Sequence, residues 1–222
     1  NGRYVWFKSR AQNLVAPPPA AAGQLFRRDM SSSTVIGASN GPEEVFLPRS
    51  SDDGQSACFQ TAGALESADS NGHFDVYLVN VGNGVLVRQS VADSVIPSPY
   101  GARDTGLGDL TPGLDKIAGY TRSRDLDAQR IANDVMPQVA EISPLAGQVR
   151  LLGSNGFDAL PDGPTDLVSL SANGQWAAIE TFADNLTPSD SNGLRDAYRL
   201  NLLNGDLTVV SRDIVGLATG SS

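Results

Sequence analysis

The chain has 222 residues, a formal net charge of −9 and an isoelectric point near 4.5. This acidic balance argues against a nucleic-acid-binding protein, which needs a basic face for phosphates, and against attraction to an anionic membrane surface. No stretch approaches the ~18 consecutive apolar residues of a membrane-spanning helix, so we expect no membrane insertion. Cys58 is the only cysteine, which excludes an intramolecular disulfide and a cysteine-based zinc site.

Short apolar runs of the strand type recur along the chain in a fixed order. The first run of each repeat occupies residues 4–7, 56–59, 116–120 and 176–179. A polar loop, a second run and a third run that leads to a Ser follow each of them. The second runs are residues 24–28, 75–79, 138–142 and 196–200, and the third runs are 34–36, 85–87, 148–152 and 207–210. A further run precedes two of the first runs, at 45–47 and 167–170.

Turn signals separate these runs. Asn-Gly pairs begin at Asn83, Asn173 and Asn204, among other places, and Asn-Gly favours the positive φ angles of tight type I′ hairpins. No segment carries the sustained apolar stripe of an amphipathic helix. The unit is therefore four short antiparallel strands with a period of roughly 50 to 60 residues, which predicts the blade of a β-propeller.

We predict an all-β fold, a β-propeller of four-stranded antiparallel blades. About four blades fit in residues 1–222, either closed on themselves or forming an arc of a larger propeller, and we favour the arc. The blade-like units cover approximately residues 1–40, 41–92, 103–155 and 164–213 of a single propeller domain or fragment. Residues 91–113 interrupt the repeat with several prolines and glycines, and we expect an inserted loop there.

The second and fourth units share the motif Asp-x-Asn-Gly-x-x-Asp-x-Tyr, which begins at Asp69 and at Asp190. Together with a Ser-x-Asp/Asn-Gly turn before the first run, it resembles the blade repeat of TolB-like β-propellers. The resemblance covers nearly the whole chain, although residues 17–23 and 132–134 replace the motif in the first and third units. It implies a scaffold that binds proteins or serves as an accessory domain, in a bacterial periplasmic or secreted protein.

The motif also places oxygen-bearing side chains around each glycine turn. Hard cations such as Ca²⁺ bind several oxygen atoms held by a bent loop, so both loops are candidate calcium sites. The alternative is that Asp and Asn cap the turn through its own backbone, as in Asx-turns. Calcium is the only cofactor that the sequence suggests. The candidate ligands are Asp69, Asn71 and Asp75 in the second unit and Asp190, Asn192 and Asp196 in the fourth.

Four other residues could carry chemistry. His73 is the only histidine, and we expect it to be an exposed loop residue, because nothing nearby resembles the nucleophile elbow that a Ser-His-Asp triad needs. Cys58 lies in an apolar run, which predicts a buried and inert thiol. Trp6 and Trp176 lie at similar positions of their repeats, which predicts packing between blades. The Arg-rich segment 122–130 also contains Asp and predicts a solvated loop.

These observations predict a non-catalytic binding or structural module of an exported bacterial protein, periplasmic or extracellular, whose rim loops hold a protein partner. The inserted loop at 91–113 is the predicted contact loop. One alternative is an accessory propeller of a larger hydrolase or peptidase, with its catalytic domain outside these residues. Another is a self-assembling surface or filament subunit, in which open strand edges join copies of the chain.

Overall fold

The computed structural model describes residues 2–70, 72–91, 106–121, 138–144, 148–152, 161–188, 190 and 192–211. Every regular element in these ranges is a β-strand. The strands are β1 (Tyr4–Ser9), β2 (Gln24–Asp29), β3 (Val35–Gly37), β4 (Phe46–Ser50), β5 (Ser56–Thr61), β6 (Asp75–Asn80), β7 (Val85–Arg88), β8 (Gly106–Leu110), β9 (Ile117–Thr121), β10 (Gln138–Ser143), β11 (Gln148–Leu151), β12 (Thr165–Leu170), β13 (Trp176–Thr181), β14 (Asp196–Asn201) and β15 (Leu207–Val209). No helix in the described ranges is long and apolar enough to cross a membrane.

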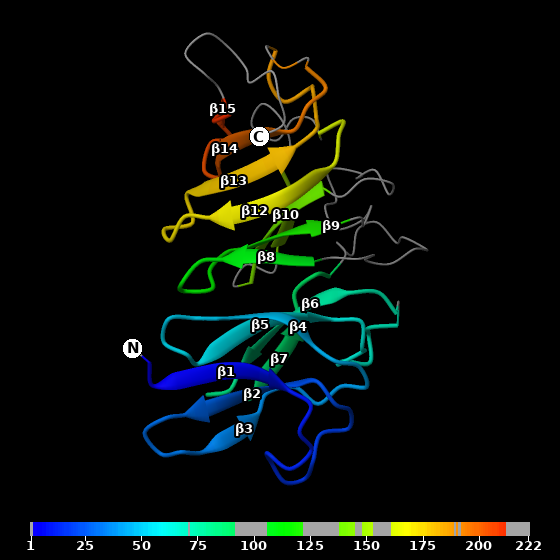
Figure 1. Ribbon diagram of the computed structural model, residues 1–222, viewed down its shortest axis with the longest axis vertical. Helices are drawn as coiled ribbons and strands as arrows, with labels where there is room; N and C mark the ends of the chain where they lie inside the picture. The colour runs from blue at the N-terminus through cyan, green and yellow to red at the C-terminus, as the bar shows by residue number, and fades with distance from the viewer. Residues whose placement is uncertain are drawn as a thin grey trace.

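The strands form four antiparallel sheets, each a meander of consecutive strands. Strands β1–β3 form a three-stranded sheet, and β4–β7, β8–β11 and β12–β15 form four-stranded sheets. The sheets follow one another in chain order along the long axis of the molecule (Figure 1). The predicted all-β architecture of four-stranded antiparallel units is therefore confirmed. Strands β1, β2 and β3 of the first sheet correspond to the second, third and fourth strands of the other three.

The hydrophobic core consists of layers between successive sheets. Side chains alternate between the two faces of a strand, so Phe59 and Cys58 of β5 point in opposite directions. Phe59 packs in the layer between the first and second sheets, with Leu25 and Tyr77. Cys58 packs in the layer between the second and third sheets, with Ile117 among others. A third layer, between the third and fourth sheets, includes Val139, Ile179, Tyr198 and Leu200.

The connections alternate between two edges of the stack because every sheet is a meander. Short turns such as 51–55 and 202–206 lie along one edge, on the left of Figure 1, which we call the turn edge. Longer loops such as 10–23, 62–74 and 182–195 lie along the opposite edge, which we call the loop edge. Asp69, Asp75, Asp190 and Asp196 all lie on the loop edge or at the strand ends that adjoin it.

The Ser-x-Asp-Gly turn between β4 and β5 is held by its own side chains. Ser51 Oγ donates to Asp53 Oδ1 at 2.6 Å and accepts from the backbone N of Ser56 at 3.1 Å. Gly54 has a φ of 69°, a left-handed conformation that suits glycine best. The same arrangement between β12 and β13 uses Ser171, Asn173 and Gly174.

The prediction of type I′ hairpins at the Asn-Gly pairs is wrong in detail. A type I′ turn needs positive φ at both central residues, but only the glycines Gly84, Gly174 and Gly205 have it. The asparagines instead brace the turns with their side chains, as when Asn83 Oδ1 accepts from the backbone N of Val85 at 3.0 Å. This is possible because residues 81–84, rather than two residues, separate β6 from β7.

The first strand of the third sheet, β8, lies inside the segment that we predicted as an inserted loop. The two glycines of Gly106–Leu110 hid the strand pattern. A register shift between Leu107 and Asp109 makes the strand irregular, and β4 and β12 have similar shifts. Residues 92–105 of the predicted insertion lie outside the described ranges.

Candidate functional site

In the second unit, both aspartates of the motif accept hydrogen bonds from residues later in the same sheet. Tyr77 donates its hydroxyl to Asp69 Oδ2 at 2.5 Å. Ser90 donates to Asp75 Oδ1 at 2.5 Å, and its oxygen accepts from the backbone N of Val76 at 3.0 Å. The motif therefore ties the long loop to β6 and to the segment that follows β7. Asn71 lies outside the described residues.

The fourth unit repeats this network. Tyr198 donates to Asp190 Oδ2, and Ser211 donates to Asp196 Oδ1 at 2.5 Å. Asn192 closes an Asx-turn, since its Oδ1 accepts from the backbone N of Leu194 at 2.7 Å. Its Nδ2 also donates to Asp196 Oδ2 at 2.9 Å. The backbone-capping interpretation of the motif therefore describes Asn192, whereas the aspartates bind side-chain donors.

Burial controls the ionisation of the two tyrosines. Burial, reinforced by the hydrogen bond to Asp69, raises the pKa of Tyr77 far above its usual range. Burial, reinforced by the hydrogen bond to Asp190, likewise raises the pKa of Tyr198. Both hydroxyls therefore remain protonated donors under all ordinary conditions, so they act as structural clamps for the loop.

A buried arginine joins the network in the second unit. Arg88 Nη1 lies 3.4 Å from Asp69 Oδ1 and 3.6 Å from Asp75 Oδ2. Its Nε lies 3.1 Å from Glu66 Oε1. Only 11% of the Arg88 side chain is exposed, so its cation lies beside carboxylates that are themselves shielded from water.

The first unit replaces the motif with other chemistry. Phe26 occupies the position of Tyr77, and its loop, residues 17–23, has no aspartate that could accept a hydrogen bond from a hydroxyl group. Gln24 takes the position of Asp75, and its Oε1 accepts from Ser39 Oγ at 2.8 Å. The tyrosine and the aspartate therefore occur together or not at all in these units, which indicates that they work as a pair.

Among the described residues, no group of three or more His, Cys, Asp and Glu side chains has the arrangement of a metal site. Calcium binding by Asp69, Asn71 and Asp75, or by Asp190, Asn192 and Asp196, stays a prediction at this point. What the geometry adds is that one oxygen of each of the four aspartates already accepts a hydrogen bond from a hydroxyl group.

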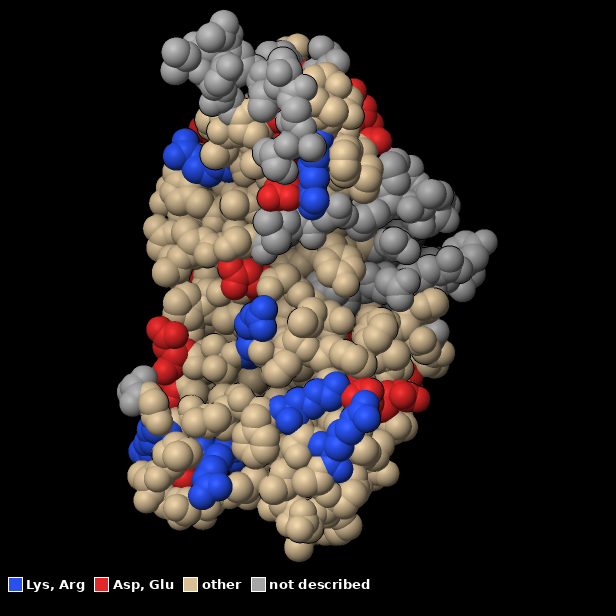
Figure 2. Space-filling view, in the orientation of Figure 1, with Lys and Arg blue, Asp and Glu red and all other residues tan. Residues whose placement is uncertain are grey.

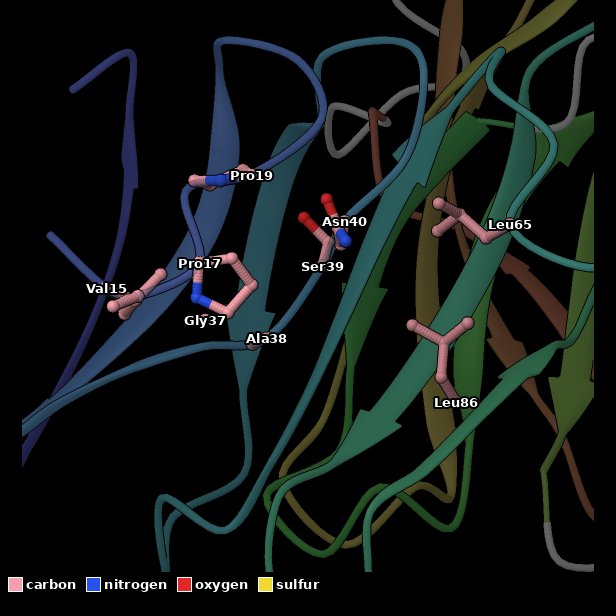
Figure 3. A pocket seen from close by; sticks show the side chains of 10 residues that line it. Val15, Pro17, Pro19, Gly37, Ala38, Ser39, Asn40, Leu65 and Leu86 are labelled. Carbon is pink, nitrogen blue, oxygen red and sulfur yellow. The ribbon is translucent and has the colours of Figure 1, made fainter. Parts of the chain in front are cut away.

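Sequence reasoning missed a groove at the loop edge, between the first and second units (Figure 3). Its volume is about 500 Å³. Pro17 and Pro19, from the loop after β1, form one wall, and Leu65 and Leu86 of the second unit form the other. The floor is the segment 37–40, at the end of β3 and just after it, where Asn40 Oδ1 accepts from the backbone N of Ala20 at 2.7 Å. The one available signal was the replacement of the Asp motif by residues 17–23.

Basic side chains gather over the first and second units on the face shown in Figure 2, despite the negative total charge. Several basic residues of these units form ion pairs. Lys8 Nζ lies 2.6 Å from Glu44 Oε2, and Arg10 lies 3.1 Å from the other oxygen of the same carboxylate. Arg3 pairs with Asp29 at 3.0 Å and lowers the pKa of that carboxyl.

The burial and contacts of the other residues singled out from the sequence are as follows. Cys58 is fully buried, and burial raises the pKa of its thiol to about 12, which fits the predicted inert thiol. His73 is partly buried rather than exposed. Trp6 packs between units as predicted, and its Nε1 donates to Gly54 O at 3.1 Å. Trp176 lies on the face of β13 opposite to Ala177 and Ile179, which pack against the third unit, and the guanidinium of Arg199 lies 4.4 Å from its ring centroid. The segment 122–130 lies outside the described residues.

No protein-family model matches the chain, and no curated protein matches it. Solved structures do. The chain is similar to dipeptidyl peptidase 4 from Porphyromonas gingivalis, with 10% identity and a TM-score of 0.57, over 94% of this chain and 31% of that one. It is similar to a putative TolB from Agrobacterium tumefaciens, with 11% identity and a TM-score of 0.51, over 94% and 61%. A prolyl endopeptidase matches with 11% identity and a TM-score of 0.50, over 86% and 26%.

These similarities establish the fold. The four sheets are blades of a β-propeller. More particularly, the fold is similar to that of a TolB propeller, the fold that the resemblance of the repeat implied. In the part of the chain that the structure describes, the sheets do not close into a ring, which is consistent with a partial propeller. The chain spans less than two thirds of the length of each structure named above.

Proposed function

We propose that this propeller is a non-catalytic binding module that holds a segment of a partner protein at its loop edge. The observation that carries the proposal is the groove between Pro17 and Pro19 on one side and Leu65 and Leu86 on the other. Two separate blades supply its walls, so the groove is formed by the packing of the fold itself. Preformed concave sites of this kind bind ligands without a large ordering cost.

The lining selects for an uncharged, largely apolar ligand. No residue that lines the groove is charged, because the lining consists of Val15, Ala16, Pro17, Pro19, Gly37, Ala38, Ser39, Asn40, Leu65 and Leu86. A phosphorylated or carboxylated metabolite would find no cation there. An aliphatic or aromatic side chain of a peptide would find apolar walls, and its backbone would find the amide and carbonyl groups of the floor.

The predicted contact loop leaves from the same edge. The segment 91–113 starts just after β7, the strand that carries Leu86. We propose that the loop and the groove contact one partner, in an exported bacterial protein that is periplasmic or extracellular. A second candidate function is an accessory propeller of a larger hydrolase or peptidase. Its support is that two of the similar structures are peptidases of which this chain spans only about a third or less.

A displayed peptide library selected against the 222-residue chain tests the proposal. We expect enriched peptides with an apolar side chain, and binding that Gly37→Leu abolishes. The Cβ of residue 37 has only Val15 Cγ2 within 4 Å, at 3.6 Å, so a leucine there can fill the groove without displacing packed atoms. Val87→Ser, on the exposed face of the strand that carries Leu86, is the matched control. Equal binding by the wild type and Gly37→Leu would contradict the proposal.

A second variant tests the insertion. Residues 92–105 can be replaced by a short Gly-Ser linker that leaves β8 intact, since β8 begins at Gly106. We expect unchanged thermal unfolding and weaker binding of the selected peptides. Unchanged binding would show that the insertion is not part of the contact surface.

A further inference from the structure

The two Asp loops have the same frame but differ at one cross-strand position. Strand pairing places Arg88 opposite Tyr77 in the second unit and Val209 opposite Tyr198 in the fourth. Val209 therefore occupies in the fourth unit the position that Arg88 occupies in the second. Thr187 likewise takes the place of Glu66, since the backbone carbonyl of each accepts from the first aspartate of its motif at 3.1 Å. The fourth unit has thus exchanged both partners of the Arg88–Glu66 ion pair for uncharged residues.

In the second unit, two carboxylate oxygens converge on the guanidinium of Arg88. They are Asp69 Oδ1 and Asp75 Oδ2, at 3.4 Å and 3.6 Å from Nη1. The other oxygen of each carboxylate accepts from Tyr77 or from Ser90. The loop therefore holds two carboxylate oxygens around one cation that the chain itself supplies.

In the fourth unit, the corresponding oxygens are Asp190 Oδ1 and Asp196 Oδ2. The other oxygen of each accepts from Tyr198 or Ser211, as in the second unit. Asp196 Oδ2 accepts from Asn192. Asp190 Oδ1 is buried and has no hydrogen-bond partner, and the residue as a whole is only 5% exposed. A buried carboxylate oxygen without a partner is costly, so a structure normally satisfies it.

We propose that the loop of the fourth unit binds a hard divalent cation of the Ca²⁺ type at Asp190 Oδ1, with Asp196 as the second carboxylate, and that the loop of the second unit does not. In the second unit the guanidinium of Arg88 fills the cation position. In the fourth unit the loop also carries Thr187, whose hydroxyl is buried without a hydrogen-bond partner. This hydroxyl can supply a further oxygen, and water completes the six to eight ligands that Ca²⁺ takes. With few protein carboxylates, the site resembles the weak calcium sites of extracellular modules, with a Kd of about 10⁻⁴–10⁻³ M.

Terbium luminescence of the full 222-residue chain provides the test. Tb³⁺ prefers oxygen ligands, as Ca²⁺ does, and Tyr198 lies against Asp190, where it can sensitise emission. We expect sensitised emission that Ca²⁺ displaces. Val209→Arg should abolish it by supplying the cation from the chain, and Asp190→Asn should lower affinity at least as much as the roughly 10- to 100-fold that loss of a supporting partner costs. Arg88→Val is the reciprocal variant and should add a second site.

Hydrogen exchange of the unmodified chain, with and without Ca²⁺, decides the matter if the variants fold poorly. We expect Ca²⁺ to slow exchange in residues 187–198 and to leave residues 66–77 unchanged. The proposal is overturned if Ca²⁺ neither displaces Tb³⁺ emission nor protects 187–198. It is also overturned if Val209→Arg folds and binds as the wild type does, or if both loops gain equal protection.

Discussion

Leu114 adopts at its turn the left-handed backbone conformation that Gly54 adopts at the equivalent turn of the second unit. The φ angles are 58° and 69°. Thr111 begins this turn as Ser51 begins the other, and its oxygen accepts from the backbone N of Lys116 at 3.1 Å. A leucine tolerates the strained conformation here because its side chain is buried, 6% exposed, between the second and third units.

Leu114→Gly should destabilise the domain despite relieving the backbone. A left-handed leucine costs roughly 1–2 kcal/mol, whereas removal of a buried leucine side chain costs about 2–5 kcal/mol even when a Cβ remains. We expect a net loss of about 1–3 kcal/mol in the free energy of unfolding, measured by urea denaturation. Gly54→Ala, whose Cβ would lie 2.8 Å from Tyr4 Cβ, should also destabilise. An increase in stability for Leu114→Gly would mean that backbone strain dominates at this turn.

Tyr77→Phe should leave Asp69 Oδ2 buried without its donor. The expected loss is about 1–3 kcal/mol in the free energy of unfolding. Phe26 shows that the repeat accepts a phenylalanine at this position when no aspartate faces it. The double variant Tyr77→Phe/Asp69→Ala should therefore lose less than the sum of the two single variants, by a double-mutant cycle. Additive losses would show that the pair is not coupled.

The strands with strong apolar patterns could be predicted from the sequence. The features that form only when residues from different blades come together could not. Strands such as β5 and β13 were located within a residue or two, because burial between two sheets demands nearly continuous apolar runs. The groove could not be predicted from the sequence, since Pro17 and Leu86 come from different blades and line one groove only when these blades pack together. The use of the Asp69 carboxylate could have been foreseen, because Asp69 and Tyr77 occur at the same spacing as Asp190 and Tyr198.

Stability should fall at high pH. Tyr77 and Tyr198 have folded-state pKa values raised above the ordinary value near 10, so the folded state keeps protons that the unfolded state releases. Their contribution is complete below about pH 10 and declines above it, by up to about 1.4 kcal/mol per pH unit for each tyrosine. Urea denaturation between pH 8 and pH 11 measures this slope. In the variant Tyr77→Phe/Tyr198→Phe, the free energy of unfolding should fall less steeply with pH. An unchanged slope would show that groups other than these two tyrosines cause the loss of stability.

Cys58 should report separation of the second and third blades. Its thiol is fully buried between these sheets and its pKa is raised to about 12, so the nucleophilic thiolate is both rare and shielded in the folded protein. We expect a thiol reagent to label Cys58 only when the chain opens, with a rate that rises with denaturant in step with the loss of β-structure. The control is Cys58→Ala/Val87→Cys, whose thiol lies on the exposed face of β7 and should react at once. Labelling of Cys58 at denaturant concentrations below the unfolding transition would instead show that the second and third blades part before the sheets themselves unfold.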